Sequence, residues 1–282
     1  MIYTRLKGSL GEQMFQYAAA RARALDLGTG VILDDRQSNI AGRGCLNMVF
    51  DLPVETSGSL PPAEDSGLPY LYWRLSGQSP KRRRERGTGY DPAFMTWPDD
   101  SYLDGAWQSE RYFAAHADTI RSDFTFRPMA DSQNAQAALR IAGSPSVSLH
   151  ATRSPGCWLI PGPASGPRFW DAALKAIAET MDTEPVVFVF SDDPDWAHET
   201  VSLGVETVFI DHNGPAQSYE DMRLMSMCMH NILSTTANAW WAGWLNANEN
   251  KFVAVPARWI GDPRLPEKAA LPARWNAIEP VG

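Results

Sequence analysis

The second half of the chain alternates short apolar runs with helix-like segments, and this pattern restricts the fold more than any other feature of the sequence. Four runs have this character: residues 147–151, 186–190, 207–210 and 252–255. Residues 169–181 and 195–203 have the spacing of helices between them. Apolar strands separated by helices are typical of a parallel sheet that is covered on both faces. The sequence therefore predicts an α/β fold with a doubly wound sheet.

Residues 218–246 (SYEDMRLMSMCMHNILSTTANAWWAGWLN) predict a helix, a short strand and a second helix with few residues between them. Ser218 followed by Asp221 resembles a capping box at the start of the first helix. The hydroxyls of Ser234, Thr235 and Thr236 fall between the strand and the second helix, where amide groups and the helix dipole favour an anion. Capping by Thr235 or Thr236 explains the same hydroxyls, and from this stretch alone we favour capping.

The first half opens like one half of a Rossmann fold. Residues 1–6 predict a strand, a glycine loop follows, and residues 12–26 predict a helix, although GxGxxG is absent. From Gly42 to Pro98 the periodicity fades, and it returns at Ser101 with a short strand that leads into a turn and a helix. A break near residues 142–145 divides the chain into two predicted domains, 1–143 and 144–282.

Composition excludes several classes of protein. The formal charge of −8 and the pI near 5.1 argue against a general nucleic-acid binder, which needs a basic surface. Three cysteines form neither a disulfide framework nor a zinc pattern, and the five histidines lack HxH or HExxH spacing, so we expect no metal site. Neither a signal peptide nor a window long enough for a membrane span is present, which predicts a cytoplasmic protein, with contact at the inner face of the membrane as the other option.

One basic run, KRRRER, begins at Lys81 and ends at Arg86 in an otherwise acidic chain. Such a run can touch an anionic membrane surface or a phosphate-bearing acceptor. A solvated loop is the simpler interpretation, and it is the one we favour.

Polar residues follow each predicted strand of the second half. These residues are His150 to Arg153, Ser191 to Asp193, Asp211 to Asn213, and Ser234 to Thr236. The carboxyl ends of parallel strands meet at one edge of the sheet, where ligands of such folds bind. The sequence therefore predicts a site for an anionic or nucleotide ligand.

Two of these clusters leave alternatives open. Arg153 can bind a phosphate through its guanidinium group or pair with a neighbouring carboxylate. Asp192 and Asp193 can accept hydrogen bonds from a base or ribose or hold a divalent metal, and one of them suits a helix N-cap.

Five blocks spread over most of the chain resemble the α-1,2-fucosyltransferases of bacteria and animals. They are GSLGEQMFQYAAARARAL (8–25), YLDGAWQSERYF (102–113), VFVFSDDPDW (187–196), DHNGPAQSYEDMRLMSMCMHNI (211–232) and AWWAGWLN (239–246). The resemblance implies a GT-B-like fold with two Rossmann-like, doubly wound halves facing a cleft. It implies inverting, metal-independent transfer of L-fucose from GDP-fucose to a sugar hydroxyl in α-1,2 linkage, with a glycan as acceptor. No cofactor is expected.

The resemblance also assigns roles to residues. Donor contacts are expected from His150, Asp192, Asp193, Ser234, Thr235 and Thr236, and acceptor contacts from Gln13, Asp104, Trp107 and Gln108. Arg153 is expected to hold the pyrophosphate. Glu12 is our candidate for the general base because it begins the helix after the glycine loop, and Asp104 would serve equally well.

Departures from the family pattern fall at polar positions. The family's HxRRGDY stands here as HATRSPG, so Thr152 replaces the first arginine, which would brace the leaving phosphate. Asn238 and Ala239 replace a Phe and a Ser of the family's NSTFSWW block. These departures leave two alternatives open: a transferase that uses another nucleotide sugar, or a relative that binds GDP or glycan without catalysis.

Overall fold

The computed structural model describes residues 1–36, 46–55, 60–86, 90–153, 166–258 and 271–279. The chain forms two compact units, the first built from Met1–Arg127 and the second beginning at Pro128. The boundary therefore lies earlier than the predicted one after residue 143. Helix α5 (Ser132–Ala142) falls within the predicted first domain of residues 1–143, but it packs on helix α8 of the second unit. Cys45 and Cys157 lie outside the described residues.

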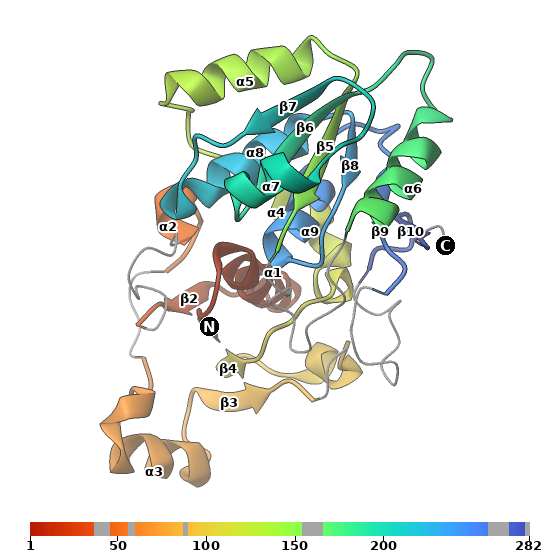
Figure 1. Cartoon of the computed structure of the whole chain (residues 1–282). Coiled ribbons are helices and arrows are strands. Elements are labelled where there is room, and N and C mark those ends of the chain that lie inside the picture. Colours follow the sequence, from red (N-terminus) through yellow and green to blue (C-terminus); the bar gives the residue numbers. More distant parts are fainter. Residues whose placement is uncertain (37–45, 56–59, 87–89, 154–165, 259–270, 280–282) are drawn as a thin grey trace. The chain divides into compact units, whose positions relative to one another are not determined.

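The first unit contains a four-stranded parallel sheet in the order β2-β1-β4-β3. Its described elements are β1 (Ile2–Arg5), α1 (Leu10–Leu27), β2 (Val31–Asp34), α2 (Leu46–Val49), α3 (Leu68–Ser76), β3 (Lys81–Arg84), β4 (Ser101–Asp104) and α4 (Ala117–Asp123) (Figure 1). Three-residue 3-10 turns at Glu110–Tyr112 and Ala114–His116 precede α4 in the segment for which the sequence predicts a helix.

Three of the described elements of this unit lie where the sequence predicted no regular structure. Helices α2 and α3 and strand β3 fall between Gly42 and Pro98, and β3 is the first part of the basic run. The interpretation of that run as a solvated loop is therefore wrong for its first four residues. Strand β3 pairs with β4 at the edge of the sheet. An edge strand tolerates charged side chains, and four basic residues in a row do not have the pattern by which a strand is predicted from sequence.

The second unit contains a six-stranded parallel sheet in the order β10-β9-β8-β5-β6-β7. Its described elements after α5 are β5 (Ser146–Ala151), α6 (Pro167–Ala178), β6 (Val186–Ser191), α7 (Pro194–Thr200), β7 (Thr207–Ile210), α8 (Ser218–Met227), β8 (His230–Ile232), α9 (Ala237–Leu245), β9 (Val253–Pro256) and β10 (Asn276–Ile278). The predicted strands are confirmed to within two residues at each end. Strand β10 was missed, because none of its three residues is buried and they form no apolar run.

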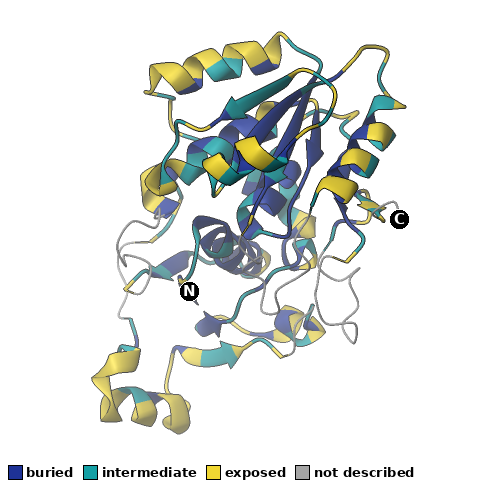
Figure 2. Ribbon diagram, viewed as in Figure 1, coloured by how far each residue is buried: buried dark blue, intermediate teal, exposed yellow. Residues whose placement is uncertain are grey.

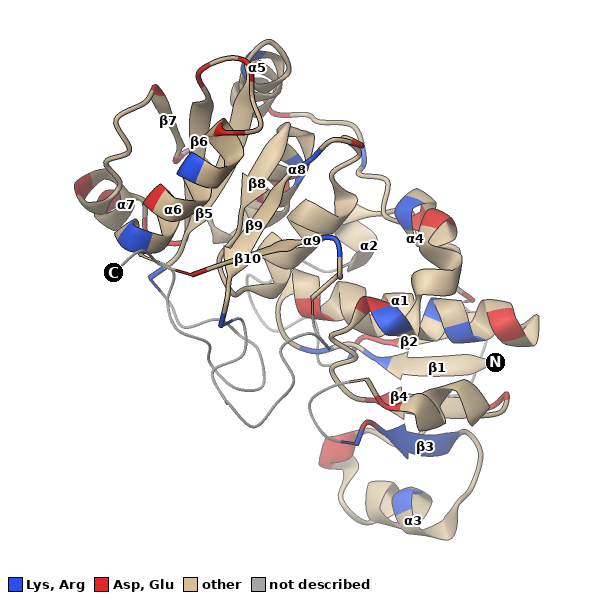
Figure 3. Cartoon of the chain, turned by 90° about the vertical axis from the view of Figure 1, so that its right-hand side faces the viewer, with Lys and Arg blue, Asp and Glu red and all other residues tan. Residues whose placement is uncertain are grey.

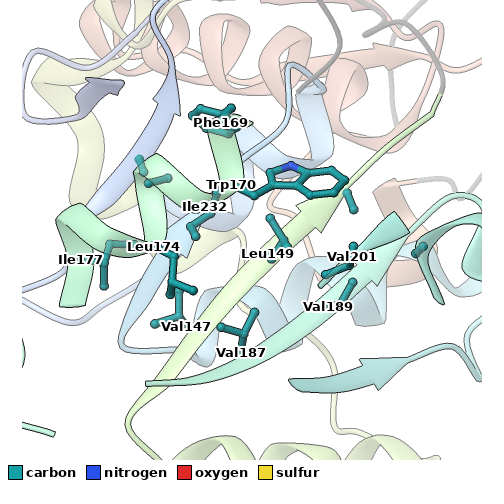
Figure 4. Packing of buried hydrophobic residues seen from close by; sticks show 14 residues of the cluster. Val147, Leu149, Phe169, Trp170, Leu174, Ile177, Val187, Val189, Val201 and Ile232 are labelled. Atoms are coloured by element: carbon teal, nitrogen blue, oxygen red, sulfur yellow. The ribbon is translucent and has the colours of Figure 1, made fainter. Parts of the chain in front are cut away.

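The sheet of the second unit is buried because helices cover both of its faces. Figure 3 shows α6 and α7 on one side of the strands and α8 and α9 on the other. Trp170, Leu174 and Ile177 of α6 pack on the apolar side chains of β5, β6 and β8 (Figure 4). The central strands β5 and β6 are buried almost throughout, which explains their unbroken apolar sequences (Figure 2).

Helix α9 is the most apolar helix of this unit. Trp240, Trp241 and Trp244 are fully buried there, and their rings contact one another at centroid distances of 4.9 to 6.3 Å. These tryptophans therefore serve the core. Within the part of the chain that the structure describes, no helix has the length and hydropathy needed to cross a bilayer.

Candidate functional site

The strand order of the second unit places a switch point between β5 and β8. From β5 the chain proceeds outward through β6 and β7, whereas β8, β9 and β10 extend the sheet in the opposite direction. The helices that follow β5 and β8 therefore leave on opposite faces, and parallel sheets of this order bind ligands at the resulting crevice. The residues just after these two strands are the predicted donor residues of the second unit.

His150 and Ser234 connect the two strands at this point. Nδ1 of His150 and the hydroxyl of Ser234 form a hydrogen bond, and Ser234 is fully buried. Burial lowers the pKa of His150 to about 4, although the carboxylate of Asp192 opposes this shift. The imidazole is therefore neutral at neutral pH, so its two nitrogens offer one donor and one acceptor.

Arg153 joins the end of β5 to the end of β6. Its backbone N–H donates to Oδ1 of Asp192 at 3.0 Å, and its guanidinium Nη1 donates to Oδ2 of Asp193 at 3.0 Å. The other oxygen of Asp193 accepts from the backbone N–H of Trp196, so the predicted helix N-cap is confirmed for Asp193. The arginine side chain is 66% exposed. Such an exposed ion pair is worth at most about 1 kcal/mol, so a more highly charged anion can displace the carboxylate.

Thr236 caps helix α9, as the simpler interpretation of the hydroxyl cluster predicted. Its Oγ1 accepts from the backbone N–H of Ala239 at 3.2 Å. Thr235 is buried and Thr236 is half-buried. The first turn of α9 thus directs its remaining amide groups toward the carboxyl end of β8, where the helix dipole favours negative charge.

The third polar cluster, after β7, is engaged elsewhere. Asn213 exchanges two hydrogen bonds with Asn134 of α5, at 2.8 and 2.9 Å, and donates to Oδ1 of Asp221 at 2.8 Å. His212 also contacts Asn134, at 3.0 Å. Burial raises the pKa of Asp221 to about 7, and the nearby Glu220 adds to the shift. The predicted capping box of Ser218 and Asp221 is therefore wrong, because Asp221 belongs to this buried network and α8 begins without a side-chain cap.

In the first unit, Asp104 lies at the end of β4 among three cations. Its carboxylate forms ion pairs with Arg82 of β3, with Arg5 at 3.7 Å and with Lys7 at 3.8 Å. Arg5 also pairs with Glu64. The carboxylate is buried and already used by its own unit.

Glu12 and Gln13 stabilise the turn between β1 and α1. The carboxylate of Glu12 accepts from the backbone N–H of Ser9 at 2.7 Å and from its hydroxyl at 2.9 Å, as one half of a capping box. Gln13 is fully buried, and its amide donates to the carbonyl of Gly8 at 3.1 Å. Gly8 has a φ of 84°, and a Cβ at this position would meet the carboxylate of Glu12, which would have to shift.

Trp107 and Gln108 follow β4 in a constrained turn. Trp107 has a φ of 55° and is fully buried, with its ring against Phe94 and Tyr112. Glu85, which sequence reasoning missed, accepts from the backbone N–H of Trp107 at 3.0 Å and from Tyr112 at 2.9 Å. Burial raises the pKa of Glu85. Gln108 is half-buried.

The structure thus places the predicted donor residues of the second unit at neighbouring strand ends. In the first unit Gln13 lies in the first turn of α1, and Asp104, Trp107 and Gln108 lie at and after the end of β4. Glu12 and Arg153 belong to different units, so their joint action stays a prediction. Among the described residues, no three His, Cys, Asp or Glu side chains converge as ligands for a metal ion.

Comparison with known proteins decides the family. The model of glycosyl transferase family 11 matches residues 88–279, which include β4 and every described strand of the second unit. The chain belongs to glycosyl transferase family 11.

Two relatives of this family 11 chain are similar over most of its length. Alpha-1,2-colitosyltransferase of Escherichia coli is 26% identical over 295 residues, which cover 99% of this chain and 99% of that protein. Galactoside alpha-(1,2)-fucosyltransferase 1 of Aotus azarae is 26% identical over 263 residues, which cover 88% of this chain and 66% of that protein.

Solved structures with the same fold are more distant in sequence. A mutant of Arabidopsis thaliana FUT1 in complex with GDP matches with a TM-score of 0.53 at 12% identity, over 95% of this chain and 72% of that one. Fucosyltransferase NodZ from Bradyrhizobium matches with a TM-score of 0.52 at 14% identity, over 86% and 91%. Together with the two parallel sheets, these matches confirm the predicted GT-B-like α/β fold of the family 11 chain.

Proposed function

We propose that this family 11 protein is an inverting glycosyltransferase that moves L-fucose from GDP-fucose to a sugar hydroxyl, forming an α-1,2 linkage. The observation that carries the proposal is the polar cluster at the switch point of the second unit. There the bond between His150 and Ser234, the guanidinium group of Arg153 and the first turn of α9 lie at the ends of adjacent strands. Family membership and the activities named for the two long relatives support the reaction type.

The pyrophosphate of the donor binds between Arg153 and the start of α9. Its charge displaces the carboxylate of Asp193 from the guanidinium group, and Asp193 remains the cap of α7. His150 and Asp192 contact the nucleotide. As the bond between fucose and phosphate breaks, negative charge grows on the leaving GDP, and the cation and the amide groups stabilise it. The acceptor hydroxyl attacks the anomeric carbon from the opposite face and gives its proton to a base.

The acceptor side is built from the first unit, through Glu12, Gln13, Asp104, Trp107 and Gln108. Glu12 is the better candidate for the base than Asp104, because three cations already occupy the carboxylate of Asp104 whereas Glu12 accepts hydrogen bonds from Ser9. Trp107 is fully buried and acts by shaping the turn that carries Gln108.

A second candidate function is transfer of another sugar by the same site. The relative that covers 99% of the chain is named as a colitosyltransferase, so a 26% identical protein of nearly equal length uses a different sugar. Asn238 and Ala239, in the first turn of α9, are departures from the fucosyltransferase pattern beside the proposed donor site. Donor choice is tested by calorimetry with a panel of nucleotide sugars that includes GDP-fucose and a colitosyl donor.

Transfer requires a group that stabilises the leaving phosphate in place of the arginine that Thr152 replaces. Thr152 is 2% exposed, so an arginine there has to extend out of a packed position. We expect wild type to transfer fucose and Thr152→Arg to change the rate, with Thr152→Gln as an uncharged control of similar length. Transfer by Thr152→Arg with none by wild type or Thr152→Gln would indicate a degenerate enzyme. Absence of GDP binding to folded wild-type protein would overturn the donor site itself.

A further inference from the structure

Helix α3 carries an apolar stripe that faces solvent. Leu68, Leu71, Tyr72 and Leu75 follow one another at helical spacing and are 80%, 41%, 65% and 73% exposed. Figure 2 shows α3 as the most exposed helix of the first unit. Single exposed apolar residues are ordinary, but four large ones on one face of a nine-residue helix form a contiguous patch, and such patches mark binding surfaces.

The stripe faces outward because the opposite side of the helix is anchored. Trp73 is 4% exposed, and its indole N–H donates to the carbonyl of Pro80 at 3.0 Å. Its ring packs edge-on against Tyr102 of β4 at a centroid distance of 5.2 Å and lies near Tyr70 at 5.7 Å. One buried tryptophan therefore fixes the orientation of α3 against the sheet and keeps the leucines in solvent.

Basic side chains border this stripe. The contact between Trp73 and Pro80 places the end of α3 beside the start of β3, and both views show the helix next to that strand (Figures 1 and 3). Arg74, Lys81 and Arg84 are exposed, and the described part of the chain offers none of them a carboxylate partner. Protection of a sheet edge accounts for charges on β3 but leaves the apolar stripe unexplained.

The acidic residues next to α3 and β3 in the sequence have other partners or neighbours. Glu64 pairs with Arg5, Asp34 and the nearby Asp65 raise the pKa of Arg36, and the carboxylate of Glu85 accepts from the backbone N–H of Trp107. Arg82 of β3 is likewise neutralised by Asp104. The cations Arg74, Lys81 and Arg84 of α3 and β3 are therefore not neutralised by these residues.

We propose that α3 and the outer edge of β3 form a surface that docks onto an anionic lipid bilayer. Helix α3 lies in the plane of the interface with its leucines among the acyl chains, and Arg74, Lys81 and Arg84 reach the headgroups. An apolar face beside Lys and Arg is the chemistry that binds peripheral helices to anionic membranes. A second copy of the chain fits less well, because the same surface on both copies would oppose like charges.

The test is cosedimentation of the full chain with vesicles of phosphatidylcholine alone or with added phosphatidylglycerol. We expect binding to the anionic vesicles that weakens as salt is added. Lys81→Gln combined with Arg84→Gln should weaken vesicle binding about 30-fold. Each cation near an anionic surface contributes about 1 kcal/mol to binding, and about 1.4 kcal/mol corresponds to a tenfold change in affinity. Leu68→Ser combined with Leu75→Ser should weaken it at least about tenfold, because these side chains would insert.

Matched controls have the same chemistry on the second unit. Leu139→Ser replaces a leucine of α5 that is 75% exposed, and the double variant Arg168→Gln, Lys175→Gln replaces two exposed cations of α6. Neither control should alter vesicle binding. Unchanged circular dichroism and melting of the α3 variant shows that it is folded. Equal binding to neutral vesicles, or equal losses in the control variants, would overturn the proposal. The proposal would also be overturned if the wild-type protein formed a dimer and the double variant Leu68→Ser, Leu75→Ser were a monomer. A second copy of the chain would then cover the surface.

Discussion

Replacing Asp221 with asparagine should stabilise the protein more as the pH rises. In the folded state burial holds the pKa of Asp221 near 7, against 3.8 for an unshifted carboxyl group. The unfolded state therefore releases its proton first, and the fold loses stability between pH 3.8 and pH 7. At 1.36 kcal/mol per pKa unit, the difference of about 3 units amounts to about 4 kcal/mol once the pH exceeds 7.

Asp221→Asn removes this dependence and keeps an acceptor, since its Oδ1 can still receive the N–H of Asn213. As the pH rises from 5 to 7, the free energy of unfolding of the variant should increase by about 2 kcal/mol relative to that of wild type, which corresponds to about 4 to 8 °C in Tm. Thermal melts followed by circular dichroism at several pH values measure the difference. Asp211→Asn is the control, because Asp211 follows β7 on the surface, in an exposed pair with His198. A difference in stability that does not change with pH would mean that Asp221 is already ionised in the folded protein, contrary to this expectation.

Three further changes test local structure, each by its effect on Tm. Gly8→Ala should lower the free energy of unfolding by more than the roughly 1–2 kcal/mol that the left-handed conformation costs a non-glycine residue, because the carboxylate of Glu12 lies where the new Cβ would be. Gly28 has a similar φ but open space around it, so Gly28→Ala should lose only the backbone strain energy. Equal drops in Tm for Gly8→Ala and Gly28→Ala would contradict the role of Glu12. Thr236→Ala should lose about 1 kcal/mol with the cap of α9, whereas an unchanged Tm would mean that the cap contributes nothing. Tyr112→Phe should lose about 1–3 kcal/mol because its hydroxyl serves both Glu85 and the backbone N–H of Asp91, and a neutral effect would show that water replaces it.

The sequence predicted most of the second unit because its strands are buried on both faces. Apolar runs of four to six residues between helices admit few other folds, and the polar residues after them marked the site. The pairing of His150 with Ser234 was beyond sequence reasoning. It depends on β8 lying beside β5, and β6 and β7 intervene between them in the chain.

The first unit was harder to predict because its elements carry atypical residues. Strand β3 is four basic residues at a sheet edge, and α3 exposes the apolar face that usually marks a core. Sequence reasoning assigned Asp104 a role at the acceptor site but not its ion pairs, since Arg5, Lys7 and Arg82 lie far from it in sequence. Glu85 was hidden within the basic run, although its carboxylate holds the turn at Trp107.

Calorimetric titration of GDP tests the central claim most directly, on wild type, Arg153→Ala and a control, Arg140→Ala, that removes another exposed arginine of the second unit. Charge-assisted hydrogen bonds to a pyrophosphate are worth about 1.5–3 kcal/mol, so we expect Arg153→Ala to weaken GDP binding about 10- to 100-fold. Arg140→Ala should bind like wild type. GDP binding of equal strength in all three proteins would contradict the account, because the nucleotide would then bind without the guanidinium group at the end of β5.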